Sequence, residues 1–194
     1  AGHLEGRGRS EDDFAFMRDE HEFRNLLLLE QPNGHFGDAL VRQFLFEAFY
    51  VHQLEALTRC SDTGLVEIAA RAVKEVTYHR RHSAKWLIRL GDGTELSHDR
   101  VQASLDDVWR YTGEMFAADS IDIALQENYD GPDLAAIQAL WLQEVTETVA
   151  EATLKLHEDA RMASGGKQGK HSEHLGFLLA EMQYLQRSFP GATW

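Results

Sequence analysis

Apolar residues recur along most of the chain at helical spacing, and no segment shows the strict alternation typical of a half-exposed strand. Residues 36–60 contain no helix breaker after Gly37 and predict one long helix. A second long helix is predicted over about 65–90, beyond a tight connection at 61–64. Because a short link makes neighbouring helices antiparallel, we expect the two to pack side by side in an up-down bundle.

Capping and breaking residues outline the other elements. Ser10 precedes three acidic residues and is expected to cap a helix, and Pro132 is expected at the first position of another. These further helices are expected over about 10–29, 97–116, 131–157 and 171–189, with Ser97 as a cap and a flexible loop at 165–170. The sequence therefore predicts an all-α, up-down antiparallel helical bundle as a single domain over residues 10–194, preceded by a disordered tail at 1–9.

Charge and composition limit the functions that fit this fold. The 194 residues include 43% hydrophobic and 26% charged residues, the balance of an ordinary globular protein, and the net charge is −13. Such a chain repels phosphate backbones and anionic membranes, so neither nucleic acid nor a membrane is expected as a partner. Cys60 is the single cysteine of the sequence, which excludes an internal disulfide and favours a cytoplasmic location.

Glu47 is the residue with the strongest indication of a site. It interrupts the window 44–51, which is otherwise apolar on every side, so its carboxylate is predicted to be buried and to need a cation or hydrogen-bond donors. Glu47 and Thr77 stand at equal distances along the chain from Asp62, in the tight connection. At about 1.5 Å per residue, two antiparallel helices place them level to within a turn.

The segment opposite Glu47 carries Glu75 and His79. A buried glutamate that faces a Glu/His cluster on the next helix resembles half of the di-iron site of a helical bundle. A complete site needs a glutamate from each of two helices and a Glu-x-x-His pair from each of the other two. This requirement makes the spacing before each histidine the decisive test.

The histidines of the chain fail that test. Val76 stands three residues before His79, and the Glu-x-x-His spacing from Glu95 to His98 lies across a loop and a helix cap. We therefore predict that this chain has no metal ligands and no cofactor of its own. Glu47, Glu75 and His79 are interpreted as the remnant of a metal site, closed by hydrogen bonds.

Other polar groups have structural interpretations. Glu144, Glu147 and Glu151 form an acidic stripe that we interpret as a solvated face. His171 and His174 share a face at the start of the last helix, where a polar first turn explains them as well as a weak metal site does.

Nor does the sequence predict a catalytic residue. Lys74, Arg80 and Arg81 are interpreted as solvated helix charges, with an anion contact as the alternative. The serines stand where caps and turns place them, and Cys60 closes a helix. Residues 165–170 lack the spacing of a phosphate-binding loop and follow no strand.

Several long motifs resemble the PaaC family, the structural subunit of the phenylacetyl-CoA epoxidase of phenylacetate degradation. The resemblance runs from about Phe14 to Trp194 and is collinear. Its motifs are 25–34, 74–79, 121–125, 165–171, 173–176 and 180–187.

The resemblance implies a ferritin-like bundle that supports a homologous catalytic partner, PaaA. That partner is expected to hold the di-iron centre and to bind the substrate thioester, while a separate reductase supplies electrons. Its Lys-Glu-Glu-x-x-His-like segment corresponds to Lys74–His79, with Val76 where a ligand glutamate would stand. Self-association into a homo-oligomer is left open.

One departure from the family is expected. Its members usually begin with a further stretch of roughly 50 residues, compatible with ordinary helix lengths, that supplies the first helix, and this sequence starts after it. Two alternatives to the structural subunit stay open: an autonomous di-iron oxygenase that uses Glu47 and His79 with the glutamates of 144–151, and a ferritin-like metal-binding protein.

Overall fold

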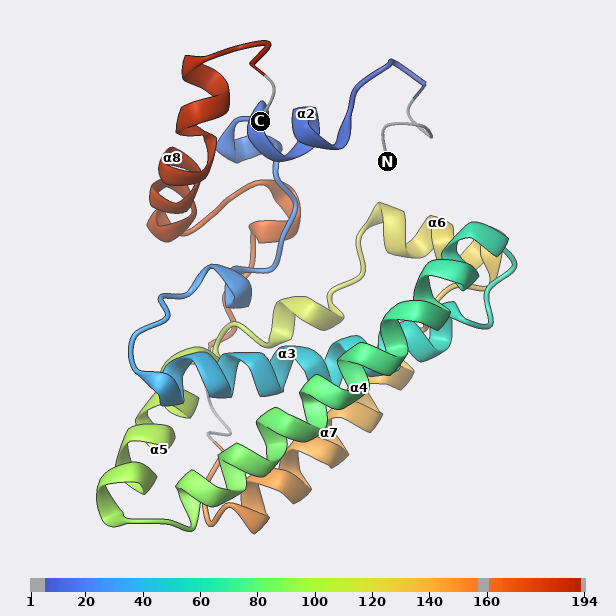
Figure 1. Ribbon diagram of the computed structural model, residues 1–194. Helices are drawn as coiled ribbons and strands as arrows, with labels where there is room; N and C mark the ends of the chain where they lie inside the picture. The colour runs from blue at the N-terminus through green and yellow to red at the C-terminus, as the bar shows by residue number, and fades with distance from the viewer. Residues whose placement is uncertain (1–5, 157–160, 193–194) are drawn as a thin grey trace. The chain divides into compact units, whose positions relative to one another are not determined.

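The computed structural model describes residues 6–156 and 161–192, and every regular element within these ranges is a helix (Figure 1). The α-helices are α2 (Glu11–Phe16), α3 (Phe36–Leu57), α4 (Thr63–Gly91), α5 (Glu95–Trp109), α6 (Ser120–Tyr129), α7 (Leu134–Glu151) and α8 (Glu173–Ser188). Short 3-10 turns are η1 (Glu20–Glu22), η2 (Leu27–Glu30), η3 (Gly113–Phe116) and η4 (Gly166–Gln168). The prediction of an all-α fold is confirmed.

The contacts gather these elements into two compact units. Unit 1 combines the two ends of the chain, Ala1–Gln31 and Ser164–Trp194, and unit 2 is the helical bundle of Pro32–Ala163. The single domain expected over 10–194 stays a prediction, as does the disordered tail, because residues 1–5 lie outside the described ranges.

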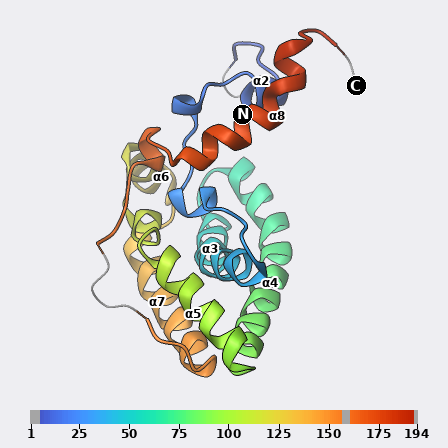
Figure 2. The ribbon, with the colours of Figure 1, turned by 90° about the vertical axis from the view of Figure 1, so that its left-hand side faces the viewer.

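Helix α3 is the centre of unit 2 and packs against α4, α5 and α7 (Figure 2). It is apolar on nearly every side, as expected of a helix surrounded by others. Leu40, Phe44, Leu45 and Ala48 are at most 3% exposed. Trp141 of α7 donates its indole N–H to the carbonyl oxygen of Leu45 at 2.9 Å, so a buried hydrogen bond joins α7 to the α3 backbone.

Helices α3 and α4 are antiparallel, as the tight connection predicts (Figure 1). Asp62 caps α4 by accepting a hydrogen bond from the Leu65 N–H at 2.9 Å. Helix α7 runs in the same direction as α4, and their C-terminal ends meet at Gly91 (Figure 1). A Cβ at Gly91 would lie 2.2 Å from the carbonyl oxygen of Ala152, so this approach requires glycine.

The long helix expected over 10–29 is wrong, because α2 ends at Phe16. Side chains of α8 take the backbone carbonyls that a longer helix would use. Gln183 donates to the carbonyl oxygen of Arg18 at 2.9 Å, and Arg187 donates to that of Phe16 at 3.2 Å. With these acceptors already bound, the backbone has less to gain from continuing the helix.

Two helix boundaries also differ from the prediction. Thr94 rather than Ser97 caps α5, which ends at Trp109, and residues up to Phe116 form a separate 3-10 turn. Ser97 is instead the reciprocal partner in the capping box of Thr94. Asp133 caps α7, so Pro132 stands before the helix instead of at its first position.

Helix α7 ends at Glu151, short of the expected His157, which lies outside the described residues. Thr153 adopts a positive φ of 59°, a conformation that a helix cannot contain. Helix α6 was not predicted, because none of its residues is buried and its sequence shows no clear apolar face. No described helix is both long and apolar enough to cross a bilayer.

Candidate functional site

Glu47 lies in the α3–α4 interface of unit 2 and is 6% exposed, which confirms the predicted burial. Both carboxylate oxygens have donors from the protein. Gln43 Nε2 donates to Oε1 and Ser83 Oγ donates to Oε2, each at 2.9 Å. A buried carboxylate is tolerated only when its oxygens are satisfied, and these two bonds provide that.

His79 approaches the same carboxylate, but more loosely. Its Nδ1 lies 3.5 Å from Glu47 Oε1, and its Nε2 lies 4.0 Å from Glu75 Oε1. The side chain of His79 is 41% exposed and that of Glu75 is 75% exposed. The structure therefore brings two of the three candidate residues together, whereas Glu75 lies in solvent beside them.

Glu144 of α7 forms a second polar cluster with α3 and α4. Its Oε2 lies 3.1 Å from Arg80 Nη1 and 3.2 Å from His52 Nε2, and its side chain is 25% exposed. Glu144 and Arg80 were interpreted as solvated charges, and the structure corrects this for both. The pairing depends on how α7 packs against α3 and α4. The packing of helices that are distant in the sequence cannot be predicted from the residues next to Glu144 or Arg80.

These side chains do not fit a di-iron centre. Val76 offers no ligand one turn before His79, and the oxygens of Glu47 and Glu144 already accept hydrogen bonds from protein donors. The cation beside Glu144 is the guanidinium of Arg80. Within residues 6–156 and 161–192, no three His, Cys, Asp or Glu side chains converge as a metal ion would require.

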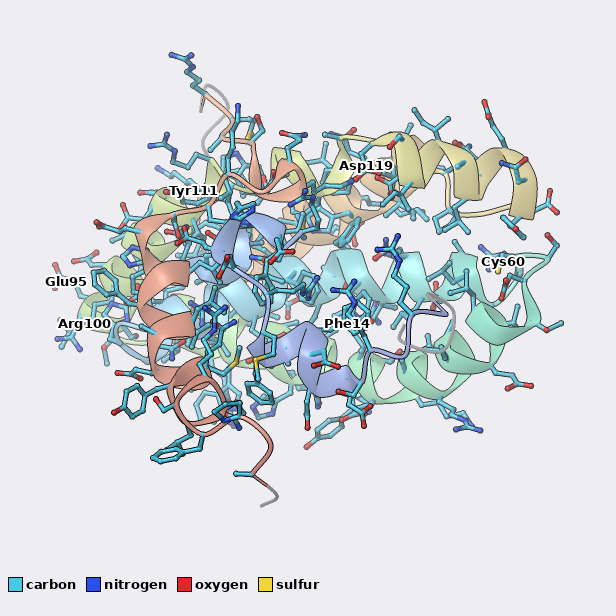
Figure 3. All side chains as sticks on the ribbon, turned by 90° about the horizontal axis from the view of Figure 1, so that it is seen from above. Phe14, Cys60, Glu95, Arg100, Tyr111 and Asp119 are labelled. Carbon is cyan, nitrogen blue, oxygen red and sulfur yellow. The ribbon has the colours of Figure 1, made fainter. Side chains whose placement is uncertain are left out.

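The remaining candidates lie apart from this cluster. Figure 3 shows Glu95 and Cys60 far from each other, at opposite ends of unit 2. Glu95 is exposed at the start of α5, whereas His98 binds the Gly91 carbonyl oxygen through Nδ1 at 2.8 Å. Cys60 is buried and its thiol donates to the Asp62 carbonyl oxygen at 3.6 Å.

Unit 1 contains a buried cluster that the sequence did not predict. Glu30 Oε1 lies 2.6 Å from His171 Nδ1, and the two side chains are 1% and 0% exposed. Ser172 donates to Glu30 Oε2 from both its backbone N–H, at 2.7 Å, and its hydroxyl, at 2.8 Å. His171 Nε2 faces the Phe23 carbonyl oxygen at 3.2 Å. This histidine therefore joins the two ends of the chain, and its side chain is buried just before the start of α8, whereas Glu173 in the first turn is exposed.

Asp38 is the most clearly perturbed acid of unit 2. Burial raises the pKa of Asp38, but hydrogen bonds from the Ser104 hydroxyl at 2.6 Å and the His35 backbone N–H at 2.8 Å, with the nearby charges of His35 and Arg42, outweigh burial. The pKa of Asp38 is therefore lowered. Burial also lowers the pKa of Arg42, against the opposing effect of the Asp38 charge. The contact with Ser104 joins the start of α3 to α5.

Comparison with known proteins agrees with this architecture. The family model described as "Phenylacetic acid catabolic protein" (PaaA_PaaC) matches residues 1–194. A curated relative from Escherichia coli (strain K12), the C component of 1,2-phenylacetyl-CoA epoxidase, is 47% identical over 194 residues, which are 100% of this chain and 78% of the relative. The all-helical bundle is consistent with the ferritin-like fold of the family. The chain therefore belongs to the PaaA/PaaC family of phenylacetic acid catabolic proteins.

Proposed function

We propose that this chain is a structural, non-catalytic subunit of a multicomponent monooxygenase that epoxidises the ring of phenylacetyl-CoA. The 47% identity with the C component of the bacterial epoxidase over the whole chain supports the assignment to that complex. The partner would be a homologous PaaA-type protein that holds the di-iron centre and the substrate. A reductase would supply electrons to the complex.

One observation carries the non-catalytic role: protein donors occupy the carboxylates that a di-iron centre would use. Ser83 and Gln43 bind Glu47, and Arg80 supplies a positive charge next to Glu144. A guanidinium already compensates the negative charge that a metal would otherwise balance. The cofactor of the complex would accordingly reside in the partner.

Exposed apolar surfaces support a role in assembly. Phe177 and Tyr184 of α8 are 70% and 66% exposed, which is unusual for large aromatic side chains. In unit 2 a groove of about 700 Å³ is lined mainly by apolar side chains, among them Trp109, Leu142 and Met162. Surfaces of this kind suit the apolar centre of a permanent interface between subunits.

The proposal is tested by co-expressing the chain with the catalytic homologue and quantifying iron in each purified partner. We expect a stoichiometric complex, with the iron in the homologue and none in this chain alone. The isolated chain should not oxidise phenylacetyl-CoA when supplied with reductase. Two irons per chain, or turnover by the chain alone, would favour the autonomous di-iron enzyme instead.

A matched pair of variants tests the contribution of α8. Phe177→Asp should weaken the complex at least tenfold, because it places a charge in the apolar centre of the interface. Leu96→Asp is the control, since Leu96 is 62% exposed at the start of α5. If titration calorimetry gives both variants the same affinity for the catalytic partner, α8 is not part of the interface.

A further inference from the structure

Helix α4 carries an unusual share of the positive charge of this acidic chain. Thr63–Gly91 contains six Lys or Arg residues and two acidic residues, a local net charge of +4, in a protein whose net charge is −13. Its acidic residues are Glu67 and Glu75. A concentrated positive field on a negative protein requires an explanation beyond solubility.

Five of these cations lie along one exposed face, named here the α4 basic face. Its residues follow the three- and four-residue spacing that keeps side chains on one side of a helix. They are Arg71, Lys74, Arg81, Lys85 and Arg89, all exposed. None of the five forms an ion pair with another described residue, in contrast to Arg80, which points inward to Glu144. From Arg71 to Arg89 the face extends about 27 Å at 1.5 Å per residue.

Aromatic side chains border the α4 basic face. Tyr78 is 57% exposed and stacks on His82 with ring centroids 6.3 Å apart, and His82 lies 6.4 Å from the ring of Trp86. Arg89 stands over the Trp86 ring at 5.3 Å. Aromatic and arginine side chains are the residues that most often dominate the binding energy of protein interfaces. The α4 basic face is therefore flanked by an aromatic contact surface.

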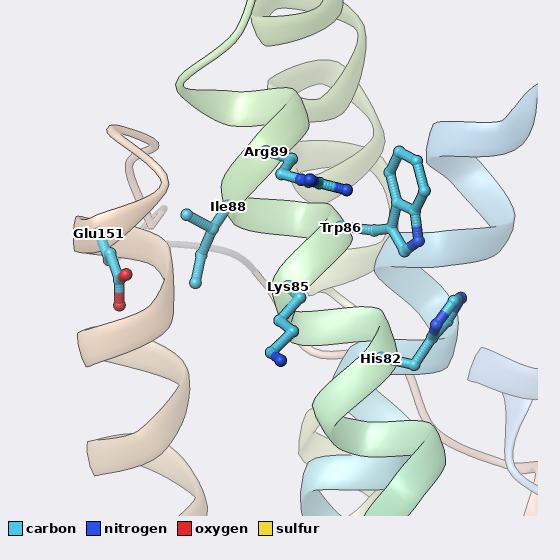
Figure 4. Close-up of a pocket in the computed structure, with 6 residues that line it drawn as sticks. All are labelled: His82, Lys85, Trp86, Ile88, Arg89 and Glu151. Carbon is cyan, nitrogen blue, oxygen red and sulfur yellow. The ribbon is translucent and has the colours of Figure 1, made fainter.

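The geometry fits a broad acidic surface better than a small anion. A pocket of about 520 Å³ lies at the C-terminal end of the face, and Figure 4 shows Lys85 and Ile88 of α4 on the side toward Glu151 of α7. Trp86 and His82 extend from the other side of α4. The cations spread along the helix instead of converging, and a carboxylate lines the pocket, so no single phosphate would be well coordinated.

We propose that the α4 basic face is the docking surface for an acidic face of the electron-donating reductase. This inference rests on the proposed function. Epoxidation by O2 inserts one oxygen atom into the ring and reduces the other to water, which consumes two electrons and two protons. Two electrons must therefore reach the complex in every cycle, and a reductase that binds and leaves would deliver them.

The α4 basic face has the character of such a transient contact. Exposed, unpaired cations accelerate encounter with an acidic partner and add little to lasting affinity. A permanent interface would instead have an apolar centre, which α8 and the groove beside α7 offer. The overall charge of −13 would repel an acidic partner approaching elsewhere, so the α4 basic face also selects the orientation.

The test uses the assembled epoxidase with purified reductase as the probe. The variant Lys74→Glu, Arg81→Glu, Lys85→Glu reverses three charges of the α4 basic face. The control Arg59→Glu, Arg100→Glu, Lys170→Glu makes the same change of net charge at exposed positions outside it. Product formation is measured against reductase concentration at low and high salt, with complex assembly checked by analytical ultracentrifugation.

We expect the variant to raise the reductase concentration for half-maximal rate at least tenfold, with the rate recovered at saturating reductase and assembly unchanged. The wild-type value should rise with salt, because screening weakens charge steering. A variant that behaves like the control overturns the inference. A variant that no longer assembles would assign the α4 basic face to a permanent interface. A variant that raises only the KM for phenylacetyl-CoA would assign the face to binding of the coenzyme A phosphates. Either result also overturns the inference. A wild-type chain that never joins the complex contradicts the proposed function itself.

Discussion

The hydroxyl of Ser83 on α4 lies 2.9 Å from Glu47 Oε2 on α3, across 36 residues of sequence. The two residues belong to helices that pack closely along their length, and both are buried. Together with the donor from Gln43, this hydrogen bond satisfies both oxygens of the buried Glu47 carboxyl group. The proposal that this chain holds no metal centre of its own rests on this satisfied carboxylate.

Removing that donor should destabilise the fold. Ser83→Ala leaves one oxygen of Glu47 without its closest donor, and a buried hydrogen bond to a charged group contributes about 1.5–3 kcal/mol. We expect the free energy of unfolding to fall by about 2 kcal/mol, measured by urea titration followed by circular dichroism.

The double variant Ser83→Ala, Glu47→Leu is the informative control. It replaces both partners with apolar groups, and such replacements are often close to neutral. The double variant should therefore be more stable than Ser83→Ala alone. A double variant at least as destabilised as the sum of the single ones would contradict this account of Glu47.

A second prediction concerns Arg80, which we regard as the internal cation of the bundle. Arg80→Ala should lower the free energy of unfolding by about 1–2 kcal/mol, between the values for exposed and fully buried pairs, because His52 is then the one described residue still paired with Glu144. The neighbouring Arg81→Ala should change stability by less than about 0.5 kcal/mol, since Arg81 is exposed. Urea titrations in low and high salt measure both; equal effects would show that Arg80 is an ordinary surface charge.

The sequence predicted the helices whose own residues determine them. α3 and α4 follow from continuous apolar spacing, a tight capped turn and glycines at their ends. The segment around Arg18 was predicted incorrectly as a helix because the side chains that bind its carbonyls, those of Gln183 and Arg187, come from the other end of the chain. The local hydrophobic pattern cannot predict donors that lie so far away in the sequence. Helix α6 has no buried residue, so its sequence shows no apolar face from which a helix could be predicted.

In the candidate site, too, the features that depend on one helix were predicted and those that depend on the packing of several elements were not. The burial of Glu47 follows from its apolar neighbours on one helix and was predicted. The level of its partner on α4 was placed at Thr77 to within a turn, but the donor is Ser83, nearly two turns further on, because helices cross at an angle and side chains lean along them. The pairing of Glu30 with His171 depends on the fold of the whole of unit 1, so the sequence could not indicate it.

Asp38 predicts a specific acid sensitivity. Its pKa in the folded protein lies below that of the unfolded chain, so folding is favoured while the carboxylate is ionised. This stabilisation is fully present above the unfolded pKa, about pH 4, and is lost as the pH falls through the folded pKa. Thermal melts from pH 7 down to pH 2.5 should show a smaller loss of Tm in Asp38→Asn than in the wild type.

Ser104→Ala provides the matched test of the cause. It removes the hydroxyl that donates to Asp38 at 2.6 Å and should move the pKa of Asp38 upward. The acid-induced loss of Tm should then begin at higher pH than in the wild type. If the two acid profiles coincide, the Ser104 hydrogen bond does not hold the pKa down.

The buried cluster of unit 1 predicts a local effect. His171→Ala removes one of the partners of a carboxylate that is 1% exposed, and a buried hydrogen bond to a charged group contributes about 1.5–3 kcal/mol. We expect faster amide hydrogen exchange in residues 20–31 and 164–175, measured by mass spectrometry. His174→Ala is the control, because no hydrogen bond or ion pair joins His174 to another described residue. Similar exchange in the two variants would show that Glu30 and His171 do not hold the chain ends together.

The last prediction tests whether one missing ligand explains the non-catalytic role. Val76→Glu restores the Glu-x-x-His spacing with His79. We expect no stoichiometric iron, cobalt or zinc in this variant after reconstitution, measured by elemental analysis. On the same helix Arg80 already balances Glu144 and Ser83 already binds Glu47, so a metal would have to displace both donors. The matched control adds Arg80→Gln to Val76→Glu and removes the competing charge, which should raise metal affinity above that of the single variant. Tight, stoichiometric metal in Val76→Glu alone would mean that the carboxylates of this bundle stay available, and that the loss of a single glutamate separates this chain from a metal-binding one.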